Sequence, residues 1–276
     1  MRISRVIVSL AAALCCASAG TAVCAAAAGA SPTGTAAAVN YVALGDSYSS
    51  GLGAGNDIAA SGRCSRSSDA YPEQWATAHS PASFASAACA GATTSDVLAR
   101  QIAALSRRTT LVSITIGGND AGFAAVMEAC VLLPTGACLG AVSAAEAFIA
   151  SQLPGRLDAT LRAIRTAAPD ARVIVLGYPH LYDLAASAGC IGLSTADRAA
   201  LNTGADDLDA ALAAAAAANG DTFADVRGQF AGHEICDSGS WLHSVDILAL
   251  SSSYHPTAAG QVAGYLPVFA AAVRSR

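Results

Sequence analysis

The sequence predicts an α/β fold in which helices cover both faces of a parallel sheet, giving three layers in the order α/β/α. Three apolar runs are continuous rather than alternating, which indicates strands that are buried on both faces. Helix-length segments separate these runs from one another and from two weaker strand candidates. Because strands and helices alternate along the chain, the sheet is expected to be parallel.

Residues 1–30 are predicted to be a secretory signal rather than part of this fold. Two arginines precede an apolar run from Val6 to about Ala19, which is the order of a signal peptide and too short for a membrane span. We expect cleavage near Ala30, leaving 31–276 as a single domain of roughly 245 residues. A lipid anchor on Cys24 is the competing interpretation, which the small residues before it disfavour.

The strands are expected in the order of the chain. Strong candidates are Asn40–Leu44, Thr110–Ile116 and Arg172–Leu176, each of which is apolar or β-branched and stops close to a glycine. Weaker candidates are Ala82–Ala87 and Thr222–Val226.

Helices are expected between and after these strands. Ser95 and Thr195 are expected to cap two of them, with Asp96 and Asp197 in the first turn. The alanine run 213–218 is interpreted as scaffold, because alanine has the highest helix propensity. The predicted helices are Tyr71–Thr77, Ser95–Ser106, Ala144–Ala167, Thr195–Ala218 and Ala258–Val273.

Charge and composition exclude some classes of partner. The net charge is -5 and the chain has only 15 Lys and Arg residues, so we expect no nucleic-acid partner, which would need a clustered basic surface. The apolar fraction of 54% is inflated by alanine and by the signal. The substrate is therefore expected to be neutral or apolar.

The cysteines predict disulfides. The chain has nine, of which three lie in the predicted signal region. An even number remains, which in an exported chain indicates three disulfides, and the absence of a C-x-x-C pair argues against a zinc site. Six cysteines allow 15 pairings, which spacing alone leaves open. The six are Cys64, Cys89, Cys130, Cys138, Cys190 and Cys236.

Three polar segments follow strands or precede the last helix, where ligands of open parallel sheets bind. Ser47 lies in Gly45-Asp46-Ser47 after the first strand, and its hydroxyl is a candidate nucleophile. Asn119, in Gly117-Gly118-Asn119-Asp120, offers an amide to a developing oxyanion. His255, before Pro256, offers a base near neutral pH. Each segment alone is equally consistent with a turn or a structural histidine, the role expected of His79, His180, His233 and His243.

The combination, with serine first, asparagine in the middle and histidine last, resembles the SGNH (GDSL) hydrolase superfamily. The four blocks of that superfamily match GDSYSSG (45–51), CAGATTSD (89–96), GGND (117–120) and YHPT (254–257). The resemblance implies a flavodoxin-like fold with a five-stranded parallel sheet. It also implies hydrolysis of carboxylic esters through an acyl-enzyme, without a metal or another cofactor.

The resemblance also implies a role for each matched residue. Ser47 would be the nucleophile and His255 the general base. The oxyanion hole would be formed by the backbone N–H groups of Ser47 and Gly91 and by the side-chain amide of Asn119.

Further segments resemble the secreted esterase and lipase branch found in actinobacteria. They are RCSRSSDAYPEQWA (63–76), GYP (177–179) and FAGHEICDSGSWL (230–242). In that branch cysteines pair consecutively, which implies the disulfides Cys64–Cys89, Cys130–Cys138 and Cys190–Cys236.

One position departs from the superfamily pattern. Many members carry an acid three residues before the histidine, but this chain has Ser252 there. We expect the backbone carbonyl of Ser252 to accept the Nδ1–H of His255 and fix its tautomer. The alternative is a distant carboxylate, of which Asp246 is the nearest before the histidine.

The sequence thus predicts a secreted, extracellular serine esterase or lipase acting on a small-molecule or lipid ester. It is expected to be a monomer that contacts lipid surfaces transiently. A phospholipase A and a carbohydrate acetylesterase remain alternatives, because loops determine the shape of the acyl pocket. A catalytically inactive binding module on the same fold is the alternative from a different class.

Overall fold

The computed structural model describes residues 38–275 except 187–189, 191 and 247–249. The predicted signal and its cleavage site therefore lie outside the described residues. Five parallel strands form one sheet in the order β2-β1-β3-β4-β5, the flavodoxin-like order, which confirms the predicted fold class. The strands are β1 (Asn40–Gly45), β2 (Ser83–Ser86), β3 (Leu111–Thr115), β4 (Arg172–Leu176) and β5 (Thr222–Ala224).

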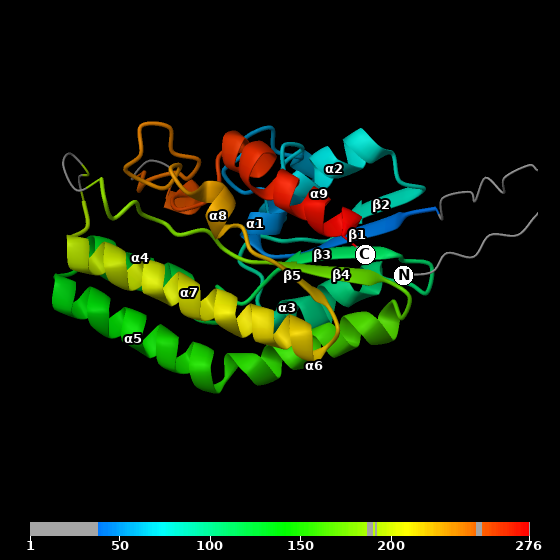
Figure 1. Ribbon diagram of the computed structural model, residues 1–276, viewed down its shortest axis with the longest axis horizontal. Coiled ribbons are helices and arrows are strands. Elements are labelled where there is room, and N and C mark those ends of the chain that lie inside the picture. The colour runs from blue at the N-terminus through cyan, green and yellow to red at the C-terminus, as the bar shows by residue number, and fades with distance from the viewer. Residues whose placement is uncertain (1–37, 187–189, 191, 247–249, 276) are drawn as a thin grey trace, which may run out of the picture. The chain divides into compact units, whose positions relative to one another are not determined.

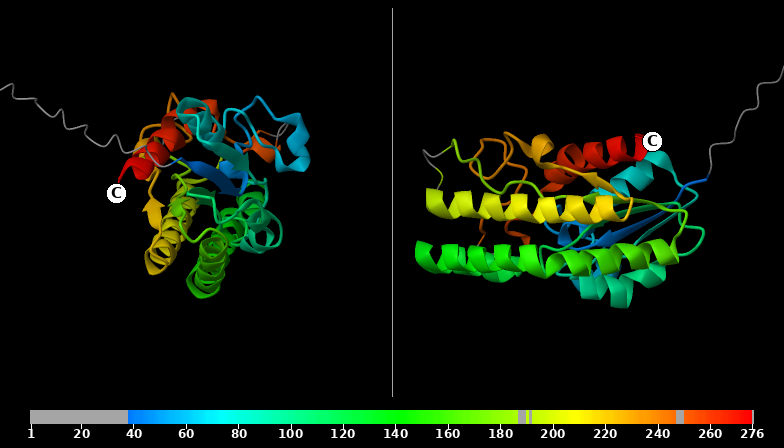
Figure 2. Two further views of the ribbon diagram at one scale, coloured as in Figure 1. Left: turned by 90° about the vertical axis from the view of Figure 1, so that its right-hand side faces the viewer. Right: turned by 60° about the horizontal axis from the view of Figure 1, so that its bottom comes forward.

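Helices connect the strands and cover both faces of the sheet. Figure 1 shows α2, α8 and α9 on one face and α3, α5, α6 and α7 on the other, and the end-on view in Figure 2 shows the same layers. The α-helices are α1 (Ser47–Ser50), α2 (Tyr71–His79), α3 (Thr94–Asp96), α4 (Phe123–Leu132), α5 (Thr135–Ser151), α6 (Leu153–Ala167), α7 (Thr195–Ala218), α8 (Arg227–Phe230) and α9 (Leu266–Arg274). Short 3-10 segments are Ala59–Cys64, Ile102–Ala104 and Leu250–Ser252, and π-helical segments are Val97–Gln101 and Gly260–Tyr265.

Burial explains why the strands could be predicted. Every residue of β3, the central strand, is buried, so both of its faces must be apolar or internally hydrogen-bonded. Tyr41 of β1 packs against Trp75 of α2 and Phe269 of α9, with ring centroids 5.3 and 5.4 Å apart respectively. These contacts fix the upper helical layer of Figure 1 on the sheet.

Capping boxes fix two helix starts one or two residues before the predicted caps. Thr93 caps α3 and Ser194 caps α7, and in each case the aspartate at the third helical position bonds back to the cap. The predictions of caps at Ser95 and Thr195 were wrong for this reason, although Asp96 and Asp197 do lie in the first turns.

The predicted helix over 144–167 is two helices. Pro154 lies in the first turn of α6, where its missing N–H costs nothing, but it cannot continue α5. The axes of α5 and α6 are bent by 52°. Within the described residues, no single helix is long and apolar enough to cross a membrane, and only this bent pair passes that test together.

The three disulfides implied by the resemblance are all present: Cys64–Cys89, Cys130–Cys138 and Cys190–Cys236. The second joins α4 to α5, and the first joins the loop before α2 to the segment after β2. Both therefore tie segments that surround the carboxyl edge of the sheet.

Candidate active site

The candidate site lies where β1 and β3 end. The chain leaves β1 to one neighbour, β2, and later returns on the other side as β3, so this is the point at which the strand order reverses. Gly45 ends β1 with a φ of 121°, and a β-carbon there would collide with the backbone of Thr115 in β3. A glycine is therefore required for the chain to turn sharply into α1.

Asp46 fixes this turn. It is the N-cap of α1, and one of its carboxylate oxygens accepts hydrogen bonds from Tyr48 N (3.0 Å) and Thr115 Oγ1 (2.7 Å). The other oxygen accepts a hydrogen bond from the Tyr178 hydroxyl. Burial raises the pKa of Asp46 to about 6, although these hydrogen bonds lower it. Ser47, the next residue, is thereby held at the start of α1.

Ser47 and His255 lie together, 208 residues apart in the chain. His255 Nε2 is 2.7 Å from Ser47 Oγ, and both side chains are buried. A neutral imidazole with Nε2 unprotonated accepts the serine hydroxyl proton in this geometry. The structure thus brings together the two residues that the sequence placed at the centre of the site.

The second ring nitrogen adds the Ser253 carbonyl to the Ser252 carbonyl expected from the sequence. His255 Nδ1 lies 2.9 Å from the carbonyl oxygen of Ser253, whereas the Ser252 carbonyl accepts the backbone N–H of His255 at 3.2 Å. The reason is Tyr254, whose φ of 65° turns the carbonyl two residues before the histidine toward the ring. The 2.9 Å contact with the Ser253 carbonyl favours the tautomer with a proton on Nδ1, and the Ser252 backbone acts on the ring in the same direction, because it too raises the pKa of His255.

Burial lowers the pKa of His255 to about 4, and the nearby His243 lowers it further, while the backbone carbonyls of Ser253 and Ser252 raise it. The ring is therefore neutral, and able to accept a proton, well below the pH at which an exposed histidine becomes charged.

This lowered pKa predicts how kcat/KM depends on pH in the acid range. A base works only in its neutral form, so kcat/KM should rise with pH to a midpoint near pH 4 and stay level above about pH 5. The measurement is kcat/KM for a soluble acetyl ester between about pH 3 and about pH 8. A midpoint at the ordinary histidine value of about 6.5 would show that burial does not depress the pKa of the base.

Asn119 lies in the turn after β3 and lines the same pocket as Ser47. One hydrogen of its amide is donated to the Ala92 carbonyl at 3.0 Å, which fixes the side chain. An amide nitrogen carries two hydrogens, so one remains beyond the hydrogen bond to Ala92.

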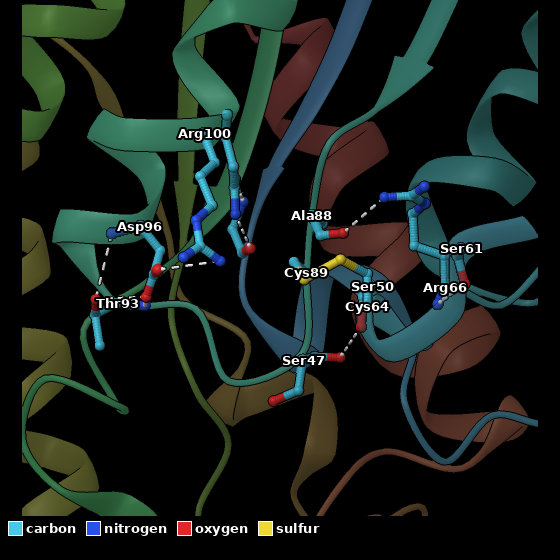
Figure 3. Close-up of a disulfide and its surroundings, with 12 residues drawn as sticks. Ser47, Ser50, Ser61, Cys64, Arg66, Ala88, Cys89, Thr93, Asp96 and Arg100 are labelled. Atoms are coloured by element: carbon cyan, nitrogen blue, oxygen red, sulfur yellow. Dashed lines mark hydrogen bonds and ion pairs between the residues drawn. A yellow bond between two sulfur atoms is a disulfide. The ribbon is translucent and has the colours of Figure 1, made fainter.

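Gly91 belongs to the segment after β2, which the first disulfide and backbone hydrogen bonds fix. Cys89 N donates to Gly45 O at 3.0 Å, and Ala90 N donates to Cys64 O at 3.0 Å. Figure 3 shows the Cys64–Cys89 disulfide beside Ser47, whose side chain points away from the sulfurs. A β-carbon on Gly91 would meet no atom of the described residues within 4 Å, so the space in front of it is open.

An apolar pocket adjoins Ser47, and sequence analysis missed most of its lining. Figures 1 and 2 show α5 and α7 extending beyond the ends of the strands, and α4 packs against α5 there. These three helices supply the pocket's outer wall: Phe123, Val126, Val142, Ala145, Ile149, Leu201, Gly204, Ala205 and Leu208.

Sequence analysis also missed Tyr48 and Tyr178 as site residues. Both line the pocket, and Tyr178 belongs to the GYP segment whose resemblance to the secreted branch was the available signal. The four other histidines have hydrogen-bond partners away from Ser47, consistent with the structural roles expected of them: Trp75 for His79, Asp206 for His180, Gly239 for His233 and Gly53 for His243.

A serine beside a histidine, with an asparagine amide lining the same pocket, is typical of hydrolases that cleave carboxylic esters. The chain belongs to the GDSL-like lipase/acylhydrolase family, whose sequence profile matches residues 43–263. It is 56% identical over 233 residues to Lipase 1 of Streptomyces coelicolor, covering 84% of this chain and 86% of the relative. The family and this relative show that the chain is a carboxylic ester hydrolase.

Solved structures show the same fold at high identity. A phospholipase A1 from Streptomyces albidoflavus is 52% identical with a TM-score of 0.83, covering 85% of this chain and 99% of that one. An extracellular lipase from Streptomyces rimosus is 51% identical with a TM-score of 0.82, covering 85% of this chain and 100% of that one.

Proposed function

We propose that this chain is an exported serine esterase that hydrolyses lipid esters through an acyl-enzyme on Ser47. The observation that carries the proposal is the 2.7 Å contact between Ser47 Oγ and His255 Nε2, together with the apolar pocket that Ser47 lines. A serine hydroxyl becomes a nucleophile when a positioned base takes its proton.

The reaction proceeds in two halves. His255 removes the proton of Ser47 as Oγ attacks the ester carbonyl, and the charge that develops on the carbonyl oxygen is stabilised by Ser47 N–H, Gly91 N–H and the Asn119 amide. The protonated ring then gives its proton to the departing alcohol. In the second half, His255 takes a proton from water, the hydroxide attacks the acyl-enzyme, and the carboxylic acid leaves as Ser47 regains its proton.

The Ser253 carbonyl stabilises the doubly protonated ring in each half. Its 2.9 Å hydrogen bond to Nδ1 becomes stronger when the ring is charged, because a charge-assisted hydrogen bond is stronger than a neutral one. A main-chain dipole thus supplies part of what a triad carboxylate supplies in other serine hydrolases.

Export is supported by the three disulfides, which form in oxidising compartments, and by the extracellular relative from Streptomyces rimosus. The predicted signal over residues 1–30 provides the route. Mass spectrometry of the chain recovered from culture medium tests export, because the exported chain should lack this segment.

The pocket favours acyl chains longer than acetyl. Its outer wall consists of apolar side chains from three helices, and such a wall stabilises an alkyl chain by roughly 0.8 kcal/mol for each methylene that it buries. Lipid esters therefore fit the site better than acetylated carbohydrates. The similarity to a phospholipase A1 makes a phospholipid the second substrate to test.

A panel of p-nitrophenyl esters from acetyl to palmitoyl, with a phospholipid beside it, tests the proposed activity. We expect kcat/KM to increase from acetyl to longer chains. Hydrolysis of none of these by folded protein would contradict the proposed activity on lipid esters. A sharp preference for acetyl would indicate a carbohydrate deacetylase.

Gly204 is predicted to set how long an acyl chain the pocket accepts. It lies in the middle of α7, where glycine costs about 1 kcal/mol relative to alanine, and it lines the pocket. A β-carbon there would lie 3.8 Å from Val142 of α5, an ordinary contact, so a larger side chain fills the pocket without a backbone clash. Gly204→Leu should lower kcat/KM for the palmitoyl ester by about tenfold or more relative to the acetyl ester.

The matched control is Ala210→Leu, which adds the same side chain to the exposed face of α7. It should leave the ratio of palmitoyl to acetyl activity within about twofold of the unmodified enzyme. An unchanged ratio in Gly204→Leu would show that the acyl chain binds elsewhere.

A further inference from the structure

The backbone that orients His255 adopts an unfavourable conformation. Tyr254 has a φ of 65°, in the left-handed region, which a bulky residue of this kind rarely adopts. This conformation is what turns the Ser253 carbonyl toward His255 Nδ1. Because the chain has a serine three residues before His255, where many members of the superfamily carry an acid, the tautomer of His255 depends on a conformation that other contacts must hold.

Two hydrogen bonds hold the Tyr254 backbone. Its N–H donates to the His243 carbonyl at 2.9 Å. Its carbonyl accepts a hydrogen bond of 2.6 Å from the hydroxyl of Tyr48. The second bond joins the loop of the histidine to the helix of the nucleophile, since Tyr48 immediately follows Ser47.

Tyr48 is itself held rigidly. Its N–H donates to Asp46 at 3.0 Å, and its ring packs edge-on against Tyr178, with centroids 5.0 Å apart. The ring also lies 5.3 Å from the His255 ring. Burial raises the pKa of Tyr48 far above its ordinary value, so the hydroxyl stays protonated and donates. A carbonyl can only accept, so the direction of the bond is fixed.

We propose that Tyr48 is a positioning residue of the reaction. Its hydroxyl holds the left-handed backbone of Tyr254, and this backbone directs the Ser253 carbonyl toward His255. Tyr48 thereby helps to orient the histidine indirectly, as an acid does directly in a Ser-His-Asp triad. The proposal rests on the proposed function, because it assigns His255 as the base. The Tyr48 ring lines the pocket, but its hydroxyl acts on the Tyr254 main chain and not on the exchanged proton.

Tyr48→Phe deletes the hydroxyl and keeps the packed ring. We expect kcat for an acetyl ester to fall about tenfold or more while KM stays within about twofold, because the base is disordered but the pocket is unchanged. The downfield proton NMR signal of His255 Nδ1–H should broaden or disappear in the variant.

The matched control is Tyr182→Phe. It also deletes a tyrosine hydroxyl next to Tyr254, but this hydroxyl lies 3.4 Å from the phenol oxygen of Tyr254 and not against its backbone. Its kcat should stay within about twofold of the unmodified enzyme.

A double-mutant cycle separates positioning from general stability. Asparagine adopts the left-handed region far more readily than tyrosine, so in a Tyr254→Asn background the hydroxyl has less to hold. There we expect Tyr48→Phe to lower kcat by less than about threefold. Equal losses in both backgrounds, an unchanged kcat, or loss of cooperative melting in Tyr48→Phe would each overturn the proposal. Failure of the Tyr48 proposal can be told apart from failure of the proposed function, because in the second case the unmodified enzyme itself would not hydrolyse the ester.

Discussion

Replacing Ser47 with alanine is expected to lower kcat/KM for every ester by at least about a thousandfold, because the change removes the atom that attacks the carbonyl. The fold should be unaffected. The hydroxyl contacts His255, whereas α1 is held by backbone groups of Ser47, whose carbonyl accepts Gly51 N at 3.0 Å. The measurement is kcat/KM on the ester panel together with the melting temperature.

The matched control for this variant is Ser68→Ala, which removes an exposed serine hydroxyl bonded to the Asn56 carbonyl at 3.2 Å. It should retain full activity. A Ser47→Ala protein that keeps more than a few per cent of the rate would show that another group is the nucleophile.

Replacing Asn119 with alanine is expected to lower kcat about a hundredfold or more, the usual loss when one oxyanion donor is removed. Because the amide is positioned by the Ala92 carbonyl before substrate binds, its hydrogen bond to the oxyanion needs no reorganisation during the reaction. KM should change little, since the charge develops only in the transition state.

Steady-state kinetics on the acetyl and palmitoyl esters provide the measurement for Asn119→Ala. Equal losses of kcat on both esters would agree with a role at the carbonyl that all esters share. An effect confined to KM would instead assign Asn119 to binding of ground-state substrate.

Local signals were sufficient for the elements in which burial or capping decides the structure. Arg172–Leu176 has the predicted bounds, because its apolar run is buried on both faces. Thr195–Ala218 also has the predicted bounds, because a capping box starts it and Gly220 follows its end. The presence of α4 and the separation of α5 from α6 at Pro154 were missed. Neither α4 nor α5 has a polar face that would reveal the helical period.

Long-range contacts decide what sequence analysis missed at the site. Ser47 and His255 could be predicted because each lies in a recognisable block at the end of an element. The contact of His255 Nδ1 with the Ser253 carbonyl was not predicted, because it accompanies a left-handed Tyr254 whose carbonyl is hydrogen-bonded to Tyr48, 206 residues earlier. Local sequence carries no signal for a bulky residue at positive φ.

The central claim is that Ser47 is the nucleophile, and labelling with a fluorophosphonate tests it most directly. The probe reacts covalently with a serine only when a base activates its hydroxyl. Peptide mass mapping after labelling should place one phosphonyl group per chain on Ser47, and prior saturation with a long-chain ester should slow the labelling. Folded protein that takes up no label, or that takes it up at a residue other than Ser47, would contradict the account.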